Sequence, residues 1–552
     1  MVERKYYIGV DVGTGSARAA IVRDDGYIVS VATEPIRIWN PKPNMYEQSS
    51  DNIWNAVTVC VKKLLAGSGV DKTSVFGIGF DATCSLVVVD KDFKPVQVSD
   101  TGDEVRNIVM WMDHRASDEA DSISHTGHKV LDQVGGTMSP EMEPPKLMWL
   151  KKHLKESCWD NAAHFFELPD FLTWRATGSL SRSLCSVVSK WGYQADGQGL
   201  SSWSESFLQK IGLEDLADNN YSRIGNDIKP PGSPCGEGLS AKAAAELGLM
   251  EKTPVGTSII DAHAGGLGCL SCNIDSPGFP EFPLSNRLAL ICGTSSCHMT
   301  LSEEPRYVAG VWGPHYSAMI PGMWLIEGGQ SATGKLLDHI VETHAAYADV
   351  ETTAATKGVS VYAVLNDILK DMASKKRIPS VSHLTKNFHL WPDFHGNRAP
   401  LADPSLTGMI SGLTLSASSE DLAILYLATV QALCYGTRHI LEEMKIKGQV
   451  INVIYLCGGL RKNPLFVSMN ADVTGMPVVL PEEKESVLLG AAMLGACASA
   501  SHYSVQSAMK AMGGRGQVMT PNLDDLSFHD KKYKVFRQMV EDQQQYRAFM
   551  SD

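Results

Sequence analysis

A pattern that occurs twice constrains the fold more than any other feature of the sequence. Near the amino terminus, two runs of β-forming residues flank a glycine-rich turn at residues 13–16, and a third run follows at 27–32. Residues 287–301 repeat the order of strand, Gly-Thr-Ser turn and strand. The two copies agree in pattern more than in identity. The repeat predicts a duplicated α/β protein whose two related domains set these turns opposite each other across a cleft.

The length of the chain supports the same organisation. Its 552 residues exceed the size, about 250–300 residues, at which a single hydrophobic core stops growing. We expect an N-terminal domain at 1–275 and a C-terminal domain at 276–552. A hydrophobic content of 44% and a charged content of 20% are those of an ordinary globular protein.

Charge and apolar segments argue against two classes of partner. The net charge is −13 and the sequence has no long basic run, so we expect neither nucleic acid nor an anionic membrane as the main partner. A small anionic ligand is still compatible, because local backbone dipoles can hold it. The amino terminus lacks a signal-peptide pattern, and the apolar run at 487–500 is too short to span a bilayer.

The 12 cysteines indicate a reducing compartment. They are scattered, most of them in apolar surroundings, and a chain of this size needs no disulfide framework. The one Cys-x-x-Cys, formed by Cys269 and Cys272, lacks the second pair that would complete a zinc site. Core thiols are the favoured interpretation, and zinc or redox chemistry is the alternative. We therefore expect a cytoplasmic enzyme.

The two glycine-rich turns are candidate phosphate sites. Such a turn can aim successive backbone N–H groups and hydroxyls at one anion, although a single copy is also common in plain hairpins. Two copies, one opening each half, could grip one polyphosphate. Asp11, just before the first turn, could hold Mg²⁺ through water. The predicted phosphate-binding residues are Gly13, Thr14, Gly15 and Ser16 in the first turn and Gly293, Thr294 and Ser295 in the second.

A single carboxylate stands at the end of a predicted buried strand. Asp261 follows an apolar run that ends at Ile260, and His263 comes two residues later. Gly265 and Gly266 would then let the chain turn into a helix. A carboxylate at a strand end beside such a turn is well placed to meet a ligand. The alternative is an Asp that only caps the helix.

Other polar residues carry weaker signals. Residues 81–85 lie between two apolar runs and form either a pocket mouth or an ordinary loop. Lys190 among apolar neighbours either extends to the surface or donates to a polyol hydroxyl. Asp113 and Arg115 belong to another polar set after an apolar run, and they form either part of a functional site or a structural ion pair. The glycine pair at 458–459 allows close contact with a nucleoside or merely reverses the chain, and the aromatic loop at 389–400 has no assigned role.

Four separated motifs carry a resemblance to a known family. They are the first hairpin, the segment at 261–266, the turn at 292–295 and the stretch Cys-Gly-Gly-Leu-Arg-Lys-Asn at 457–463. Their order and spacing resemble those of the FGGY carbohydrate kinases over nearly the whole chain. Residues 81–86 and the loop at 393–398 are similar to the ribulokinase branch.

The resemblance implies an actin-like (ribonuclease H-like) α/β fold of two domains with the active site in the interdomain cleft. It also implies ATP and Mg²⁺ as cofactors and phosphorylation of the terminal (5-) hydroxyl of a pentulose, D-ribulose first. L-ribulose, xylulose or another polyol are alternatives. A non-catalytic nucleotide-binding protein of this fold is a further one, against which Asp261 argues, since a scaffold needs no such carboxylate. A homodimer is compatible with this interpretation.

The resemblance also assigns roles to particular residues. Asp261 would be the general base, and Asp11 would place Mg²⁺ directly or through water. Gly329 would lie near the phosphates. The expected adenosine-binding residues are Gly458, Gly459 and Asn463, and the expected sugar-binding residues are Asp81, Thr83, Cys84, Lys190, Asp261 and Glu327.

Overall fold

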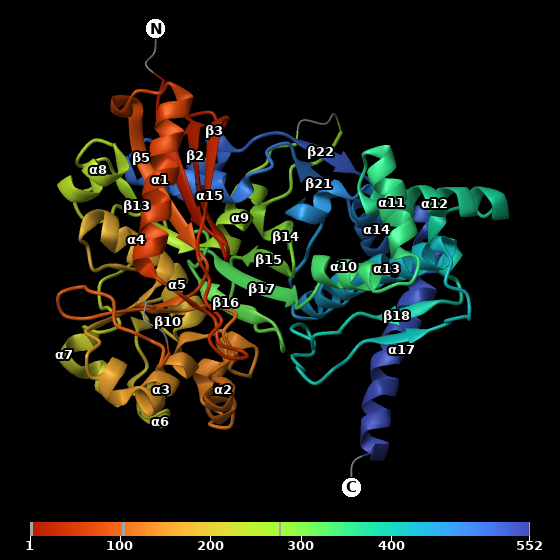
Figure 1. Ribbon diagram of the computed structural model, residues 1–552, viewed down its shortest axis with the longest axis horizontal. Helices are drawn as coiled ribbons and strands as arrows, with labels where there is room; N and C mark the ends of the chain where they lie inside the picture. Colours follow the sequence, from red (N-terminus) through yellow and green to blue (C-terminus); the bar gives the residue numbers. More distant parts are fainter. Residues whose placement is uncertain (1–3, 102–104, 275–277, 551–552) are drawn as a thin grey trace.

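The computed structural model describes residues 4–101, 105–274 and 278–550. The expected domain boundary between residues 275 and 276 lies outside these described residues. The chain forms two lobes, each built on a central mixed sheet with helices on its faces (Figure 1). No helix of the described part of the chain is both long and apolar enough to cross a membrane. All twelve cysteines are free thiols.

The N-terminal lobe contains a five-stranded sheet in the order β13-β5-β1-β2-β3. The hairpin strands pair antiparallel, whereas β1 with β5 and β5 with β13 pair parallel. A parallel strand pair needs a crossover connection, and α1 (Ser50–Ser68) lies in the crossover that leads from β3 to β5, the parallel neighbour of β1. The strands are β1 (Tyr6–Val12), β2 (Ser16–Arg23), β3 (Ile28–Pro35), β5 (Val75–Ala82) and β13 (Val255–Ile260).

The C-terminal lobe repeats this arrangement inside a seven-stranded sheet. Its order is β16-β17-β15-β14-β20-β21-β22, and the five strands from β17 to β21 match β3-β2-β1-β5-β13 in order and direction. The duplicated two-domain fold predicted from the two hairpins is therefore confirmed. The strands are β14 (Arg287–Cys292), β15 (Ser296–Ser302), β16 (Trp312–Tyr316), β17 (Trp324–Gln330), β20 (Val453–Cys457), β21 (Val478–Pro481) and β22 (Gly516–Met519).

Smaller sheets and the remaining helices complete both lobes. A four-stranded sheet contains β4 (Glu47–Gln48), β7 (Ile108–Val109), β6 (Leu86–Val89) and β8 (His164–Glu167). Two-stranded sheets are formed by β9 (Arg182–Ser183) with β12 (Ile228–Lys229), β10 (Gln194–Ala195) with β11 (Ser201–Ser202), and β18 (His389–Trp391) with β19 (Met409–Ser411). Helices of the first half are α2 (Ser117–Ser124), α3 (Glu143–His153), α4 (Leu168–Thr177), α5 (Leu184–Lys190), α6 (Glu205–Lys210), α7 (Asp218–Tyr221), α8 (Ala241–Leu247) and α9 (Asp261–Leu270). Those of the second half are α10 (Gly334–Glu342), α11 (Tyr347–Lys357), α12 (Val361–Lys376), α13 (Ser419–Ile446), α14 (Pro464–Thr474), α15 (Ser486–Ala498), α16 (Val505–Met512) and α17 (Leu526–Met550).

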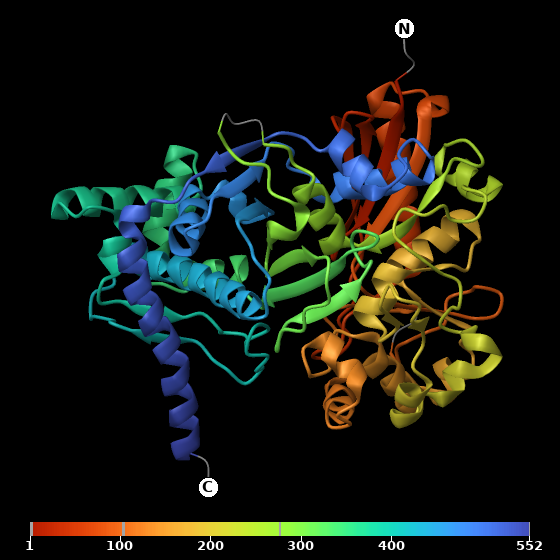
Figure 2. The ribbon, with the colours of Figure 1, turned by 180° about the vertical axis from the view of Figure 1, so that it is seen from behind.

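Helix α15 packs on the N-terminal sheet although it comes from the second half of the chain. Its apolar residues join a core cluster that contains residues of both lobes. Figure 2 shows this part of the chain, in blue, against the red strands of the N-terminal sheet. Glycines permit backbone contact, because a Cβ on Gly79 would lie 2.0 Å from the Ala491 carbonyl oxygen. A Cβ on Gly490 would likewise lie 2.1 Å from the Ala264 carbonyl oxygen, so α15 and α9 touch closely.

One local expectation is wrong. Helix α9 begins at Asp261 itself, so Gly265 and Gly266 lie inside the helix and not in a turn before it. Burial explains these glycines better than chain reversal, because they face packed neighbours. A Cβ on Gly266, for example, would lie 2.8 Å from the sulfur of Met319.

Candidate active site

The two glycine-rich turns occupy equivalent places in the two sheets. The Gly13 N–H donates to the Ser16 carbonyl (3.0 Å), and the Gly293 N–H donates to the Ser295 carbonyl (2.9 Å). A Cβ on Gly13 or Gly293 would meet only ordinary contacts at 3.8 and 3.9 Å, and one on Gly15 would meet nothing within 4 Å. The fold itself therefore does not require glycine here, and the glycines leave the backbone open to a ligand.

Hydrogen bonds from other segments of the chain hold both turns in position. The Thr14 hydroxyl accepts a hydrogen bond from the Trp111 indole N–H (3.1 Å), and the Thr14 carbonyl accepts one from Gln48 (3.0 Å). At the second turn, the N–H groups of residues 333–335 donate to the carbonyls of Gly293 and Thr294. The start of α10 thus lies directly against the second turn.

Asp261 lies at the junction of β13 and α9 and is half-buried. Its Oδ1 accepts a hydrogen bond from the Ala262 N–H (2.7 Å). Partial removal from water, together with the negative charge of Asp11, raises the pKa of Asp261 to about 7. A carboxyl group with such a pKa can take up and release a proton near neutral pH.

Asp81 does not reach the surface of the site. It is fully buried in β5, paired in register with Asp11 on β1, and neither carboxylate oxygen receives a hydrogen bond from a described residue. Burial and the neighbouring Asp11 and Asp261 hold the pKa of Asp81 well above its ordinary value. The expected sugar contact is thus a buried carboxyl group next to Asp11 on the neighbouring strand, and not one that is exposed to a ligand.

Asp11 already has a cationic partner that the sequence did not point to. The Arg18 guanidinium donates to Asp11 Oδ2 through Nε (2.8 Å) and Nη2, and through Nη1 to Glu485 Oε2 (2.7 Å), just before α15. Across the described residues, no three metal-binding side chains come together as a ready-made site. Asp11 therefore offers one carboxylate to a cation and not a cage.

Lys190 and Glu327 come together from opposite lobes. Lys190 ends α5 and is only 5% exposed, so its ammonium does not extend to the surface. Burial alone would lower the pKa of Lys190, but Cys84, Glu327 and Glu141 raise it above its ordinary value. Both Lys190 and Glu327 also act electrostatically on Asp261. Three of the predicted sugar-site residues are thus neighbours.

His263 connects this group of residues. Its Nε2 lies 2.9 Å from Glu327 Oε2, and its Nδ1 lies 3.0 Å from the Cys185 sulfur on α5. Burial alone would raise the pKa of Glu327, but the hydrogen bond with His263 and the nearby Arg398 lower it below its usual range. Glu327 is therefore an anion with a fixed orientation.

The remaining predicted sugar contacts lie in the same region. Thr83 follows β5 and is buried, with its N–H donating to the Val12 carbonyl (3.0 Å) and its hydroxyl 3.3 Å from that of Ser85. Cys84 is also buried, and burial raises the pKa of its thiol to about 12 although Lys190 is close. Cys84 thus acts as a neutral side chain beside the ammonium.

Structural reasons account for three other predicted site residues. Gly329 lies within β17, where a Cβ would be 2.7 Å from the Ser296 carbonyl oxygen and 3.2 Å from the Arg398 side chain. Gly458 has φ 90°, and its Cβ would be 2.3 Å from the Cys292 carbonyl oxygen. Asn463 caps α14, and its amide donates to the Tyr426 hydroxyl (2.7 Å). Gly459, in contrast, is exposed with open space around it.

Sequence reasoning missed Arg398 and Trp312. Arg398, from the loop at 389–400 whose role was unassigned, lies 4.3 Å from the Trp312 ring centre, and Lys190 lies 4.4 Å from the same ring. A resemblance of the loop to the ribulokinase branch was the only signal. By contrast, Asp113 and Arg115 form the structural ion pair, which is buried and also includes Glu47.

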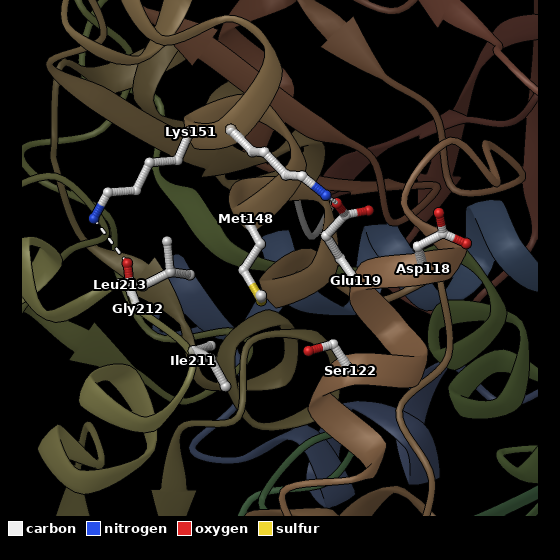
Figure 3. Close-up of a pocket in the computed structure, with 9 residues that line it drawn as sticks. Asp118, Glu119, Ser122, Met148, Lys151, Ile211, Gly212 and Leu213 are labelled. Atoms are coloured by element: carbon white, nitrogen blue, oxygen red, sulfur yellow. Dashed lines mark hydrogen bonds and ion pairs between the residues drawn. The ribbon is translucent and has the colours of Figure 1, made fainter.

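A surface cavity lies apart from the candidate active site. It encloses about 250 Å³ between α2, α3 and residues 211–213, and Met148 and Ile211 supply part of its apolar lining (Figure 3). Lys151 and Lys152 at its edge are already paired with Asp215 and Glu119. It contains none of the predicted site residues.

Comparisons with known proteins identify the family of the chain. The N-terminal domain model of the FGGY family of carbohydrate kinases matches residues 6–268, and the C-terminal domain model matches residues 288–499. A human protein named FGGY carbohydrate kinase domain-containing protein is 54% identical over 550 residues, covering 99% of this chain and 98% of that protein. The D-ribulokinase of Saccharomyces cerevisiae is 40% identical over 100% of this chain and 79% of its own length.

A solved structure, the xylulose kinase from Rhodospirillum rubrum, has the same fold. The TM-score is 0.78 at 19% identity, over 98% of this chain and 99% of that chain. The duplicated sheets, the two turns and the relatives over the whole length lead to one conclusion. The chain belongs to the FGGY family of carbohydrate kinases.

Proposed function

We propose that the protein transfers the γ-phosphoryl group of ATP to the 5-hydroxyl of a pentulose, with D-ribulose as the preferred acceptor. The observation that carries this proposal is Asp261, a half-buried carboxyl group with a pKa of about 7 beside Asp11 on one side and Lys190 and Glu327 on the other. The yeast relative named D-ribulokinase supports the choice of acceptor. Two bacterial relatives named ribulokinase are 27% and 29% identical. L-ribulose, xylulose and other polyols are the alternative acceptors.

Asp261 acts as the general base in this proposal. Phosphoryl transfer depends on positioning and on charge stabilisation, with a carboxylate that accepts the proton of the attacking hydroxyl. A pKa near 7 suits this task, because the group is substantially ionised at neutral pH and still basic enough to take a proton. Lys190 donates to the sugar hydroxyls and Glu327 accepts from them. Thr83 and Cys84 line the same side.

The nucleotide lies against the two turns. Backbone N–H groups and hydroxyls at 13–16 and 293–295 bind its phosphates, and Gly459 offers an open backbone surface to the adenosine. The structural reasons found for Gly329, Gly458 and Asn463 leave these three as supporting residues around the nucleotide.

A single carboxylate suits Mg²⁺, which takes few protein ligands and keeps several waters. Both Arg18 bonds fall on Oδ2 of Asp11, so a water-mediated role for the other oxygen is compatible with this pairing. When bound, Mg²⁺ would neutralise charge on the phosphates of ATP.

A cytoplasmic location agrees with the twelve free thiols. The homodimer and the domain boundary between residues 275 and 276 stay predictions.

A coupled assay of ADP release tests the proposal. The full-length chain is supplied with ATP, Mg²⁺ and, one at a time, D-ribulose, L-ribulose, D-xylulose, ribitol or arabitol. We expect the highest kcat/KM with D-ribulose and little ADP release without an acceptor. Another preferred acceptor would correct the substrate and keep the kinase. ATP binding without turnover on any acceptor would favour the non-catalytic alternative.

A further inference from the structure

Arg398 lies in the loop between β18 and β19, which internal hydrogen bonds hold in shape. Asn397 fixes the loop, because its amide donates to Asp393 (2.8 Å) and its side-chain carbonyl accepts from the Leu401 N–H (2.9 Å). The stem of Arg398 then passes over Gly329, where any side chain would crowd it. Gly329 thus provides the space in which Arg398 reaches the sugar-site residues.

The charged end of Arg398 meets groups from both lobes. It lies 4.3 Å from the Trp312 ring centre, 3.6 Å from Glu327 and 3.9 Å from Glu141. Lys190 from α5 lies 4.4 Å from the same ring. Figure 1 shows β16 and β17, which carry Trp312 and Glu327, beside α5 at the junction of the lobes. Two cations therefore share one aromatic ring next to the predicted acceptor site.

Neither the Arg398 guanidinium nor the Lys190 ammonium donates a hydrogen bond to another group of the described residues. Lys190 is 5% exposed and the Arg398 side chain is 18% exposed. Carboxylates at 3.6–3.9 Å hold the charge of Arg398 without taking its N–H groups. The nitrogen atoms of both cations keep some contact with solvent, so their N–H groups are open to oxygen atoms of a ligand that displaces this water.

We propose that Arg398 determines acceptor specificity by donating a forked pair of hydrogen bonds to two adjacent oxygen atoms of the sugar. The proposal rests on the proposed kinase function and adds a contact to its acceptor site. A planar guanidinium presents two parallel N–H groups, whereas an ammonium is a point donor, so Lys cannot replace Arg in this role. The guanidinium carbon lies over the Trp312 ring, and this cation–π contact helps to hold the guanidinium at the site.

The test compares Arg398→Lys and Arg398→Met with the parent protein. Arg438→Lys is the matched control, since Arg438 is 21% exposed, lies 4.4 Å from the Tyr533 ring centre and pairs with Glu442 and Asp530. We measure KM for the preferred sugar, KM for ATP, and the ratio of kcat/KM between D-ribulose and its C3 epimer D-xylulose. Sugar affinity without nucleotide is measured by calorimetry, and folding by thermal denaturation.

We expect Arg398→Lys to raise the sugar KM at least about tenfold and to reduce the epimer ratio by a similar factor, with the ATP KM within twofold. Arg398→Met, which keeps the stem, should lose more, and Arg438→Lys should change neither. Unchanged sugar KM and epimer ratio in Arg398→Lys would overturn the proposal. So would sugar and ATP KM rising together with a lower melting temperature, which indicates a purely structural ion pair.

Failure of the kinase proposal gives a different result. If the parent protein neither binds nor phosphorylates any sugar of the panel, both proposals fall. If it uses a sugar other than a pentulose, the same comparison with that sugar and its epimer still decides the role of Arg398.

Discussion

Replacement of Asp261 by Asn should separate stability from activity. Asn keeps the size of the side chain but cannot accept the proton of the attacking hydroxyl. We expect kcat to fall by a factor of about 10² or more, the usual contribution of a general base. The coupled ADP-release assay with the preferred sugar measures this loss directly.

The same substitution should raise the stability of the folded protein while it lowers the activity. The pKa of Asp261 is raised in the folded state from 3.8 to about 7, so the protonated form is favoured there. Its contribution to stability is complete below pH 3.8 and is lost as the pH rises through about 7. A shift of this size corresponds to about 4 kcal/mol at most. Because Asp261 is partly exposed, solvent screening reduces the effect to about 1–2 kcal/mol.

Asp261→Asn removes this ionisation and should therefore unfold at a higher denaturant concentration than the parent at pH 8, with little difference at pH 4. Asp92→Asn serves as the control and should change neither property, because this exposed carboxylate pairs with no described residue other than its neighbour Lys91. Parent-like turnover in Asp261→Asn would refute the assignment of the base. Lower stability at pH 8 would refute the account of its pKa.

Three further predictions test other parts of the structure. In the parent protein, kcat/KM should fall about tenfold from pH 8 to pH 6, since Asp261 becomes protonated over that range; a flat profile with a rate-limiting chemical step would contradict this. Gly15→Ala should leave the melting temperature unchanged, because a Cβ there has open space, yet raise the ATP KM several-fold if the first turn binds phosphate. Gly490→Leu should destabilise the protein by about 3 kcal/mol or more, since its side chain would meet the α9 backbone at Ala264; denaturant unfolding that matches the parent would exclude the close contact of α9 and α15.

The sequence predicted regular elements well because their signals are local. The runs of β-forming residues around each glycine-rich turn predicted the two hairpins, and their repetition indicated the duplicated sheets. The start of α9 was misplaced because glycine usually marks a turn, whereas here Gly266 and Gly268 serve helix packing. Glycine also occurs for different reasons at different positions. A side chain at Gly15 would have open space, whereas the positive φ and close backbone contact at Gly458 require glycine.

The candidate site was only partly predictable for a related reason. Asp261 and Lys190 stood out because each is a polar residue in an apolar stretch. Arg18 alternates with apolar residues along β2 and reads as an ordinary strand residue, so its pairing with Asp11 and Glu485 was not visible. Arg398 and Trp312 meet across 86 positions of the sequence, and no local pattern reports such a contact.

The position of α15 has a consequence for synthesis on the ribosome. The strands β1, β5 and β13 are complete once Ile260 has emerged, but the helix that covers them begins at Ser486, about 225 residues later. At translation speeds of about 5–20 residues per second, the nascent chain exposes this apolar surface for roughly 10 to 45 s. The first lobe must therefore wait for nearly the last part of the polypeptide, and chaperone protection during that interval would matter more for this chain than for one whose halves mature independently.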